Sequence, residues 1–151
     1  TNIRKRYMYR VEELMQVGKN IYTYTISTDV DEQFIDITYL VREAIDKANI
    51  DEGIVTVFCP HTTAGITINE NADPDVTRDI LVGLDKIFPI DGDYRHFEGN
   101  SHAHLKASTM GSSCTVIVSD GHLMLGTWQS IYFCEFDGPR NRRVIINTIS
   151  S

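Results

Sequence analysis

Alternating apolar and polar positions predict that strands dominate this chain. Residues 20–27 alternate between two faces in the period-two pattern of a half-buried strand. Residues 5–12 predict a strand before it, with a turn at Gly18 between the two. The apolar run 54–59 predicts a further strand, which Pro60 ends or moves to a sheet edge.

Residues 61–69 alternate again, and here the two faces of the predicted strand differ in chemistry. One face is apolar and carries Ala64, Ile66 and Ile68. Successive side chains of a strand point to opposite sides, so the other face collects hydroxyl, amide and imidazole groups. The residues of this polar face are His61, Thr63, Thr67 and Asn69.

Helical spacing of apolar residues predicts two helices in the first two thirds of the chain. The first covers about residues 38–49, with Thr38 as its N-cap. The second begins at Asp73-Pro74, because Asp is a favoured N-cap and Pro is favoured at the first helical position. Its apolar stripe continues until Pro89.

The last third of the chain predicts a short helix and then several strands. Residues 90–101 are loop-like, and the helix covers about residues 102–110. Turns are expected at Asp120-Gly121 and at Asp137-Gly138-Pro139, since Asp-Gly between apolar runs favours a hairpin. The expected strands are 114–119, 122–125, 129–136 and 142–149.

Composition supports the same fold class. Ile and Val total 29 residues against seven Leu, and β-branched side chains fit strands better than helices. No repeat or linker interrupts the 151 residues, so we expect one domain over residues 1–151. We predict an α+β fold with mostly antiparallel, sandwich-like or jelly-roll-like sheets and two or three helices.

Apolar runs, cysteines and charge narrow the class of protein. No apolar run is long enough to cross a membrane, and the basic N-terminal stretch lacks the apolar core of a secretory signal. Three cysteines without a C-x-x-C pair are unlike a disulfide framework, so we expect a reduced, cytoplasmic protein. The net charge is −7, which argues against a nucleic-acid partner because such proteins need a dominant basic face.

Histidines mark the region where chemistry is expected. Four of the five lie between positions 61 and 104: His61, His96, His102 and His104. Histidine is a common metal ligand and the natural acid or base near neutral pH. His102 and His104 would point the same way on a strand but lie about 200° apart on a helix. No compact ligand spacing such as H-E-x-x-H is present, so the pattern predicts a polar pocket and leaves a metal open.

Other polar residues offer recognition chemistry, although each also has an ordinary structural interpretation. Glu70 could act in a site or merely shape the turn before Asp73. Trp128 offers a flat apolar face and Gln129 both a donor and an acceptor. The candidate phosphate partners, equally compatible with a solvated surface, are Lys106, Arg142 and Arg143.

Several of these pieces occur in an order that resembles the YjbQ-like family, whose members are often labelled secondary thiamine-phosphate synthases. The resemblance extends over most of the chain, and its combination of short motifs is specific. The motifs are His61-Thr62-Thr63-Ala64, Thr67 to Pro74, Arg78-Asp79, Tyr94-Arg95-His96, Glu98-Gly99, Ala103 to Ser108, Gly126 to Ile131 and Arg142-Arg143. The chain departs from the pattern at His102, where many relatives have proline.

The resemblance implies a β-rich α+β fold of jelly-roll appearance, assembled as a homotrimer. Pockets would then lie near subunit boundaries, where two chains could complete one site. His61 and His104 become the leading functional residues. The next group, with Thr63 and Asn69 as further substrate-binding candidates, is His96, Glu70, Lys106, Trp128, Gln129 and Arg143.

The reaction that the resemblance implies joins a hydroxymethylpyrimidine pyrophosphate to a thiazole phosphate and expels pyrophosphate. We expect Lys106 and Arg143 to hold phosphate groups and Glu70 to support Mg²⁺. His61 or His104 would donate hydrogen bonds to the leaving group, and Trp128 would pack on a ring. A TIM barrel, the fold of dedicated thiamine-phosphate synthases, typically needs ~250 residues, so any such activity here is a separate and weak or secondary one.

Two other functions use the same residues. A metal-dependent hydrolase would bind zinc or a similar ion through His61 and His104. Its third ligand would be His96, His102 or Glu70. A non-catalytic trimer would bind a small phosphorylated molecule or another anion without turnover.

Overall fold

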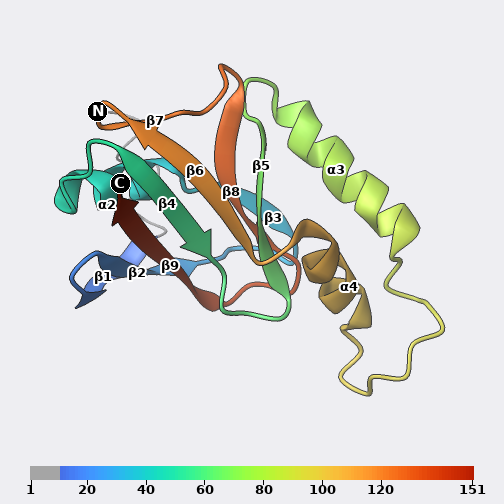
Figure 1. Ribbon diagram of the computed structural model, residues 1–151. Coiled ribbons are helices and arrows are strands. Elements are labelled where there is room, and N and C mark those ends of the chain that lie inside the picture. Colours follow the sequence, from blue (N-terminus) through green and yellow to red (C-terminus); the bar gives the residue numbers. More distant parts are fainter. Residues whose placement is uncertain (1–10) are drawn as a thin grey trace.

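The computed structural model describes residues 11–151, which form two antiparallel sheets and three helices (Figure 1). A six-stranded sheet has the order β1-β2-β9-β4-β6-β7, and a three-stranded sheet has the order β3-β8-β5. This arrangement confirms the predicted α+β class with antiparallel sheets. The strands are β1 (Val11–Gly18), β2 (Ile21–Ser27), β3 (Gln33–Asp36), β4 (Gly53–Phe58), β5 (Ala64–Glu70), β6 (Ser113–Ser119), β7 (His122–Leu123), β8 (Gln129–Glu135) and β9 (Asn141–Ser150). The helices are α2 (Thr38–Lys47), α3 (Pro74–Ile87) and α4 (Ser101–Met110).

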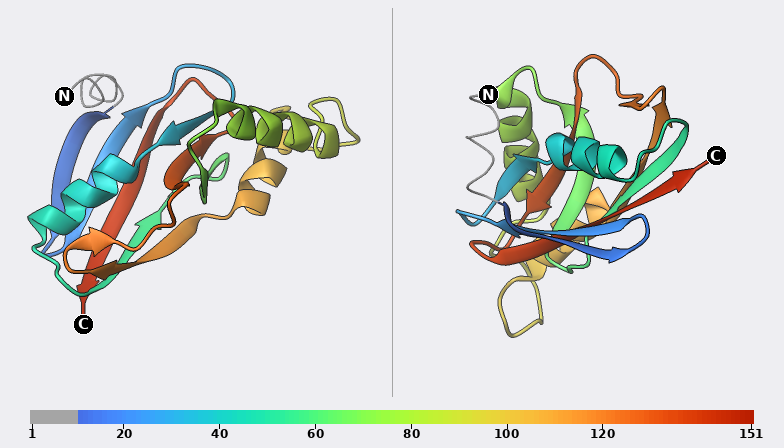
Figure 2. Two further views of the ribbon diagram at one scale, coloured as in Figure 1. Left: turned by 90° about the horizontal axis from the view of Figure 1, so that it is seen from above. Right: turned by 90° about the vertical axis from the view of Figure 1, so that its left-hand side faces the viewer.

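The main core lies on one face of the six-stranded sheet. Along β9, Arg142, Val144, Ile146 and Thr148 are buried, while the residues between them are more accessible. The inward residues of β2, β4 and β6 follow the same alternation and meet α2 and the three-stranded sheet (Figure 2). Helix α2 contributes the apolar stripe Leu40, Val41, Ala44 and Ile45 to this core.

Strand β8 is buried on both faces, because it lies between the main core and a second cluster. Ile131 and Phe133 face the main core, whereas Tyr132 and Cys134 belong to the second cluster. Helices α3 and α4 close that second cluster through residues such as Leu84, Ala103 and Ala107. A strand that is buried on both faces needs apolar residues at consecutive positions, and residues 131–134 form such a run.

A buried ion pair joins the end of β8 to the start of β9. The guanidinium of Arg142 donates to both carboxylate oxygens of Glu135, over 2.8 and 2.5 Å. Thr28 donates a third hydrogen bond to Glu135, and Arg142 also donates to the hydroxyl of Thr63. Glu135 is completely buried and Arg142 is 4% exposed. The pair therefore links both sheets and the segment that precedes β5.

The sequence predicted α3 more accurately than α2. Asp73 caps α3 as expected, since its Oδ1 accepts from the backbone N–H of Asp75 over 2.9 Å. The predicted Thr38 cap is wrong, because Thr38 is already helical and Ile37 is the N-cap residue. The Thr38 hydroxyl instead accepts from the N–H of Ile131 in β8, and Asp36 accepts from the Thr38 N–H. The Thr38 hydroxyl thus bonds to Ile131, far away in the sequence, and does not cap the N-terminus of its own helix.

The strand predictions are confirmed in the last third and corrected near the start. Strand β1 continues to Gly18, beyond the predicted end of the first strand at residue 12, and residues 5–10 of that prediction fall outside the described residues. Strand β3 was not predicted, because its four residues contain only one fully buried side chain, Ile35. Strand β5 begins at Ala64, so His61 lies in the connection before it.

Within residues 11–151, no helix is both long and apolar enough to span a bilayer.

We predict that Arg142→Met lowers the free energy of unfolding by about 3–5 kcal/mol, because it leaves Glu135 buried and unpaired. The matched control is Arg140→Met, whose exposed guanidinium pairs with Asp137 at the surface and should contribute at most about 1 kcal/mol. Equilibrium urea unfolding at equal protein concentration measures both variants. Equal losses in the two variants would contradict the role given to the buried pair.

Candidate functional site

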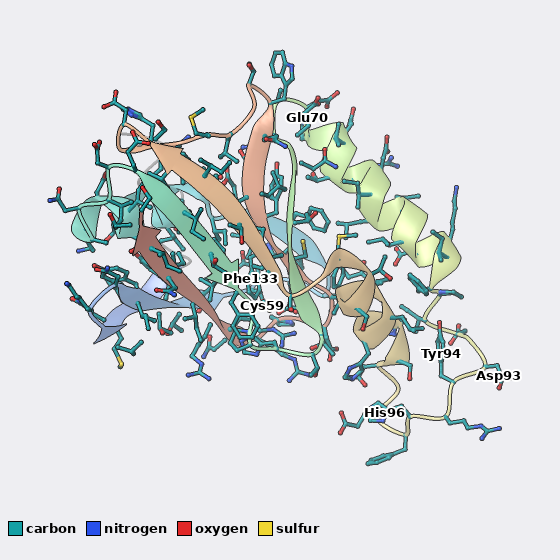
Figure 3. All side chains as sticks on the ribbon, viewed as in Figure 1. Cys59, Glu70, Asp93, Tyr94, His96 and Phe133 are labelled. Atoms are coloured by element: carbon teal, nitrogen blue, oxygen red, sulfur yellow. The ribbon has the colours of Figure 1, made fainter. Side chains whose placement is uncertain are left out.

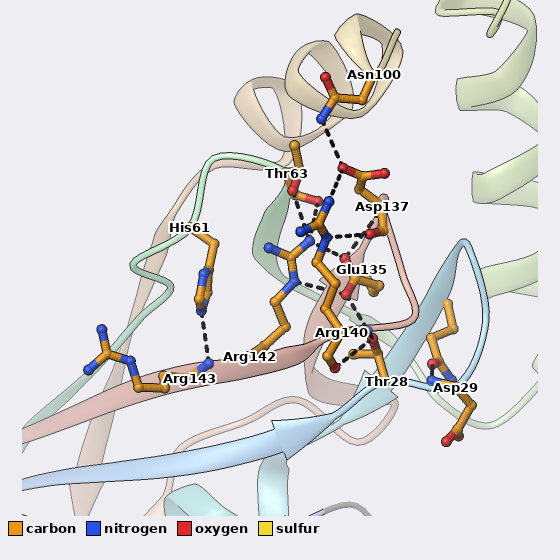
Figure 4. Close-up of polar contacts among 11 residues, drawn as sticks. Thr28, Asp29, His61, Thr63, Asn100, Glu135, Asp137, Arg140, Arg142 and Arg143 are labelled. Carbon is orange, nitrogen blue, oxygen red and sulfur yellow. Dashed lines mark hydrogen bonds and ion pairs between the residues drawn. The ribbon is translucent and has the colours of Figure 1, made fainter. Parts of the chain in front are cut away.

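A pocket of about 290 Å³ opens between the β4–β5 connection, the start of α4 and the turn before β9 (Figure 4). Segments far apart in the sequence supply its walls. It brings together His61 and His104, the two leading candidates, with two arginines and two carboxylates. Its lining residues are Pro60, His61, Thr62, Thr63, Glu98, Asn100, His104, Asp137, Arg140 and Arg142. We call it the His61 pocket.

His61 is held by the backbone of β9. The backbone N–H of Arg143 donates to Nε2 of His61 over 2.8 Å, as Figure 4 shows. Burial, with the positive charges of Arg142 and Arg143, lowers the pKa of His61 below its ordinary value. A neutral imidazole that accepts at Nε2 carries its proton on Nδ1. His61 therefore offers this pocket a hydrogen-bond donor.

Three arginines around the start of β9, at positions 140, 142 and 143, have different surroundings. Arg140 donates from Nε and Nη2 to the carbonyl and carboxylate of Asp137. Arg142 points inward to Glu135, and Arg143 lies on the opposite, accessible face of the strand. Among residues 11–151, the Arg143 guanidinium forms no ion pair. Of the three arginines near His61, Arg140 and Arg142 each pair with a carboxylate, whereas Arg143 has no carboxylate partner among the described residues.

His104 reaches the pocket from α4 and contacts a second histidine. Its ring is nearly perpendicular to that of His96, with the ring centroids 5.4 Å apart. Nε2 of His96 lies 3.7 Å from a carboxylate oxygen of Glu98, which also lines the His61 pocket. The 90–100 connection thus brings His96 and Glu98 to His104.

Within residues 11–151 of a single chain, the histidines do not converge as a set of zinc ligands. Because 102–110 is helical, His102 faces a separate pocket with Asp31, Glu32 and Asp85, away from His104. Nε2 of His61 already accepts from the Arg143 backbone N–H, so a metal at this nitrogen would have to displace that hydrogen bond. In the part of the chain that the structure describes, no three His, Cys, Asp or Glu side chains converge as metal ligands.

Lys106 lies away from the His61 pocket. Its side chain is completely buried, and its amine bonds to Glu32 from the β2–β3 connection and to Asp85 from α3. These two carboxylates raise the pKa of Lys106 although burial opposes the charge. Lys106 therefore ties α4 to its neighbours, and its hydrogen bonds go to protein groups.

The remaining candidates gather at the other end of the three-stranded sheet. Glu70 pairs with Gln129, and Trp128 lies one residue before the start of β8. Thr63 and Asn69 are six residues apart, which corresponds to roughly 20 Å along a strand. Figure 3 shows Glu70 at the far end of β5 from His96 and Tyr94. One chain therefore separates this second group from the residues of the His61 pocket, and His102 and Lys106 lie apart from both, near Glu32 and Asp85.

Hydrogen bonds within and beside the β5–β8 ladder hold the second group. The Trp128 carbonyl accepts from the N–H of Asn71, and the Gln129 side chain accepts from the N–H of Gly126. The Glu70 carbonyl accepts from the hydroxyl of Tyr132. Trp128 itself is 63% exposed. Its flat face is available to a partner but is not part of the His61 pocket.

Arg140 and Asp137 are pocket residues that the sequence did not single out. The Asp137-Gly138-Pro139 motif indicated a chain reversal there. It carried no signal of which segment that turn would meet, because the contact with residues 60–63 spans more than seventy positions.

Comparison with known proteins places the chain among relatives of similar length. The model of the family described as "UPF0047 protein YjbQ-like" matches residues 22–151. A UPF0047 protein of Methanocaldococcus jannaschii is 47% identical over 135 residues, covering 89% of this chain and 98% of that protein. The UPF0047 protein YugU of Bacillus subtilis is 53% identical over 125 residues, covering 82% of this chain and 95% of YugU.

Solved structures show the same likeness. A YjbQ/UPF0047 family protein of Clostridium acetobutylicum has a TM-score of 0.83 at 65% identity, covering 84% of this chain and 98% of that one. A protein of Sulfolobus solfataricus, described as of unknown function, has a TM-score of 0.83 at 31% identity, covering 87% of this chain and 96% of that one. These matches confirm the resemblance found in the motifs, and the chain belongs to the YjbQ-like UPF0047 family.

Proposed function

We propose that the protein binds a small phosphorylated molecule in the His61 pocket and has a weak or secondary thiamine-phosphate-synthase-like activity. In that reaction the thiazole nitrogen forms a bond to the methylene carbon of the pyrimidine. The bond from that carbon to the pyrophosphate oxygen breaks, and its electron pair leaves with pyrophosphate. The site must therefore stabilise negative charge that grows on the departing oxygen.

The observation that carries the proposal is the hydrogen bond from the Arg143 backbone to His61. It fixes an N–H donor in a pocket that Arg140 and Arg142 also line, with Arg143 beside it. Donors and guanidinium groups recognise phosphate oxygens. The sequence left two other functions open. One of them, anion binding, is already the binding step of this proposal. A zinc hydrolase is disfavoured because it needs His61 as a ligand.

The residues that line the His61 pocket also limit the chemistry that a single chain can perform. Glu70, Trp128 and Gln129 do not line the His61 pocket, so the chain's own geometry supports no Mg²⁺ or ring contact by them there. They would have to act on the substrate from a neighbouring subunit, which a homotrimer allows. A cytoplasmic location and the absence of a nucleic-acid partner stay predictions.

The outer face of the six-stranded sheet supports self-association. Ile54, Phe58, Ile117 and Ile149 are all exposed on its adjoining strands β4, β6 and β9. The alternate positions between them on this face are Thr56, Thr115, Ile145 and Asn147, none of which is charged. A neighbouring subunit can cover such a face without burying an unpaired charge at these positions. We propose that a second copy of this chain covers it in the homotrimer.

For phosphate recognition, we predict that His61→Ala weakens pyrophosphate binding at least about ten-fold, because the Nδ1–H donor is lost. His61→Asn should retain more affinity, since an amide N–H can occupy a similar position. The matched control is His122→Ala, which removes an exposed histidine of β7 outside the pocket. Isothermal titration calorimetry measures all four proteins. If His61→Ala bound pyrophosphate with the affinity of the wild type, His61 would not be a phosphate-binding residue.

For catalysis, we predict that the purified protein forms thiamine phosphate from the two substrates. His61→Ala and His104→Ala should each lower the rate by about 10²-fold or more, the size expected for a lost proton or hydrogen-bond donor. Product formation is followed by chromatography, with His122→Ala again as the control. If both variants keep the full rate, the catalytic roles are wrong.

For assembly, we predict a mass of three 17.1 kDa chains by light scattering during size-exclusion chromatography. Ile117→Lys should reduce the mass to that of one chain, because a charge is placed on the apolar face at an exposed position. Val82→Lys, on exposed helix α3, should leave the mass unchanged. A wild-type protein that runs as a monomer refutes the proposal.

A further inference from the structure

The outward face of the six-stranded sheet continues directly to the His61 pocket. Phe58, the last residue of β4, points outward and pairs with Ile145 of β9. Arg143 is the adjacent outward position of β9, and its backbone N–H is the group that orients His61. A protein surface that covers this face therefore also lies at the edge of the pocket.

Arg143 brings a positive charge to a face that is otherwise neutral. Every other outward position of β2, β4, β6 and β9 carries an uncharged side chain. Within residues 11–151, the Arg143 guanidinium has no carboxylate partner. A surface that buries this face must supply a carboxylate to Arg143, because an unpaired buried charge is costly.

The symmetry of a trimer requires a second, different patch on each chain. In a closed ring of three subunits, each contact joins one patch of a chain to another patch of its neighbour. The second patch must carry an exposed apolar group for the neutral part of the face. It must also carry a carboxylate without a partner for Arg143.

The far end of the three-stranded sheet has both features. Trp128 is 63% exposed there, and tryptophan is a frequent anchor of protein interfaces. Glu70 lies at this end of β5, as Figure 3 shows, and pairs with Gln129 in the β5–β8 ladder. Within residues 11–151, the Glu70 carboxylate forms no ion pair. We call Glu70, Trp128 and Gln129 the Trp128 end.

The charge around the Trp128 end is complementary to Arg143. Its two chain segments, 67–75 and 126–130, contain three acidic residues and no Lys or Arg. The exposed apolar residues of 87–97, in contrast, lie between Lys86 and Arg95, whose positive charges would oppose that of Arg143. The Trp128 end is therefore the better match to the outward face.

We infer that the Trp128 end of one subunit covers the outward face of the next, so that Arg143 pairs with Glu70 of the partner subunit. The partner's Trp128 then packs over Phe58 and Ile145. This inference rests on the homotrimer proposed above and names the second patch of that assembly. It also brings the partner's Gln129 to the edge of the His61 pocket.

The inference separates two tasks of Arg143. Its guanidinium joins two subunits, whereas its backbone N–H orients His61 within its own chain. A substitution of the side chain leaves that backbone donor in place. The subunit contact can therefore be tested without removing the hydrogen bond that holds His61.

The test reverses the charge at the two positions and measures the dissociation constant of the trimer by light scattering over a dilution series. Arg143→Glu and Glu70→Arg should each raise that constant about ten-fold or more, because like charges then face each other. Arg143→Glu combined with Glu70→Arg should restore most of the association, since the pair forms again in the opposite orientation.

The matched control combines Arg143→Glu with Asp46→Arg, which reverses an exposed acid on α2 and gives the same net charge as the restored pair. This control should dissociate as readily as Arg143→Glu alone. Circular dichroism checks that each variant folds. Arg143→Gln and Glu70→Gln, which only remove a charge, replace any reversal that fails to fold and should also raise the dissociation constant.

The outcomes distinguish this interface from the proposed function. If the wild type is a trimer and neither reversal changes its dissociation constant, the interface is wrong while the trimer stands. If both reversals weaken the trimer and the combined variant does not recover, Arg143 and Glu70 are not paired. If the wild type is a monomer, this inference fails with the homotrimer, whereas the pyrophosphate titration of His61→Ala still decides phosphate binding.

Discussion

The buried pair between Arg142 and Glu135 is the interaction on which the site geometry depends. Neither charge can stay buried without the other, so the end of β8 and the start of β9 are fixed relative to each other. Thr63, bonded to the same guanidinium, fixes the β4–β5 connection at this point. His61 lies two residues earlier in that connection. The position of the imidazole thus follows from a structural ion pair that lies beneath the pocket.

Strand alternation then divides adjacent arginines between two tasks. Arg142 turns inward and holds the sheets, whereas Arg143 turns outward and leaves its backbone N–H to orient His61. Helix geometry has a similar effect in α4, because residues two positions apart point to different sides of a helix. His104 faces the His61 pocket, whereas His102 and Lys106, one helical turn apart, both face the side of the carboxylates Glu32 and Asp85. Side chains two positions apart on α4 therefore do not share one site.

Local signals in the sequence predicted the elements but not the partners of each side chain. Asp73-Pro74 marked the start of α3 because both residues act within one turn. Thr38 was misread as a cap because its hydroxyl bonds to Ile131, ninety-three positions away. His61 and His104 were singled out together and do meet in one pocket, whereas Lys106 was expected there and lies elsewhere. Asp137 indicated only a turn, and nothing in the sequence placed that turn or Arg140 beside the β4–β5 connection, since the contact is long-range.

Strand β8 has a consequence for how the molecule opens. Both of its faces are buried and both of its edges are paired, with β3 and with β5. No fluctuation can expose its amides to solvent without breaking a ladder and opening at least one of the two clusters. Its amide hydrogens should therefore exchange with deuterium only through the largest, near-global openings. The sandwich and the helices that carry His104 and Asp85 would then melt as one cooperative unit.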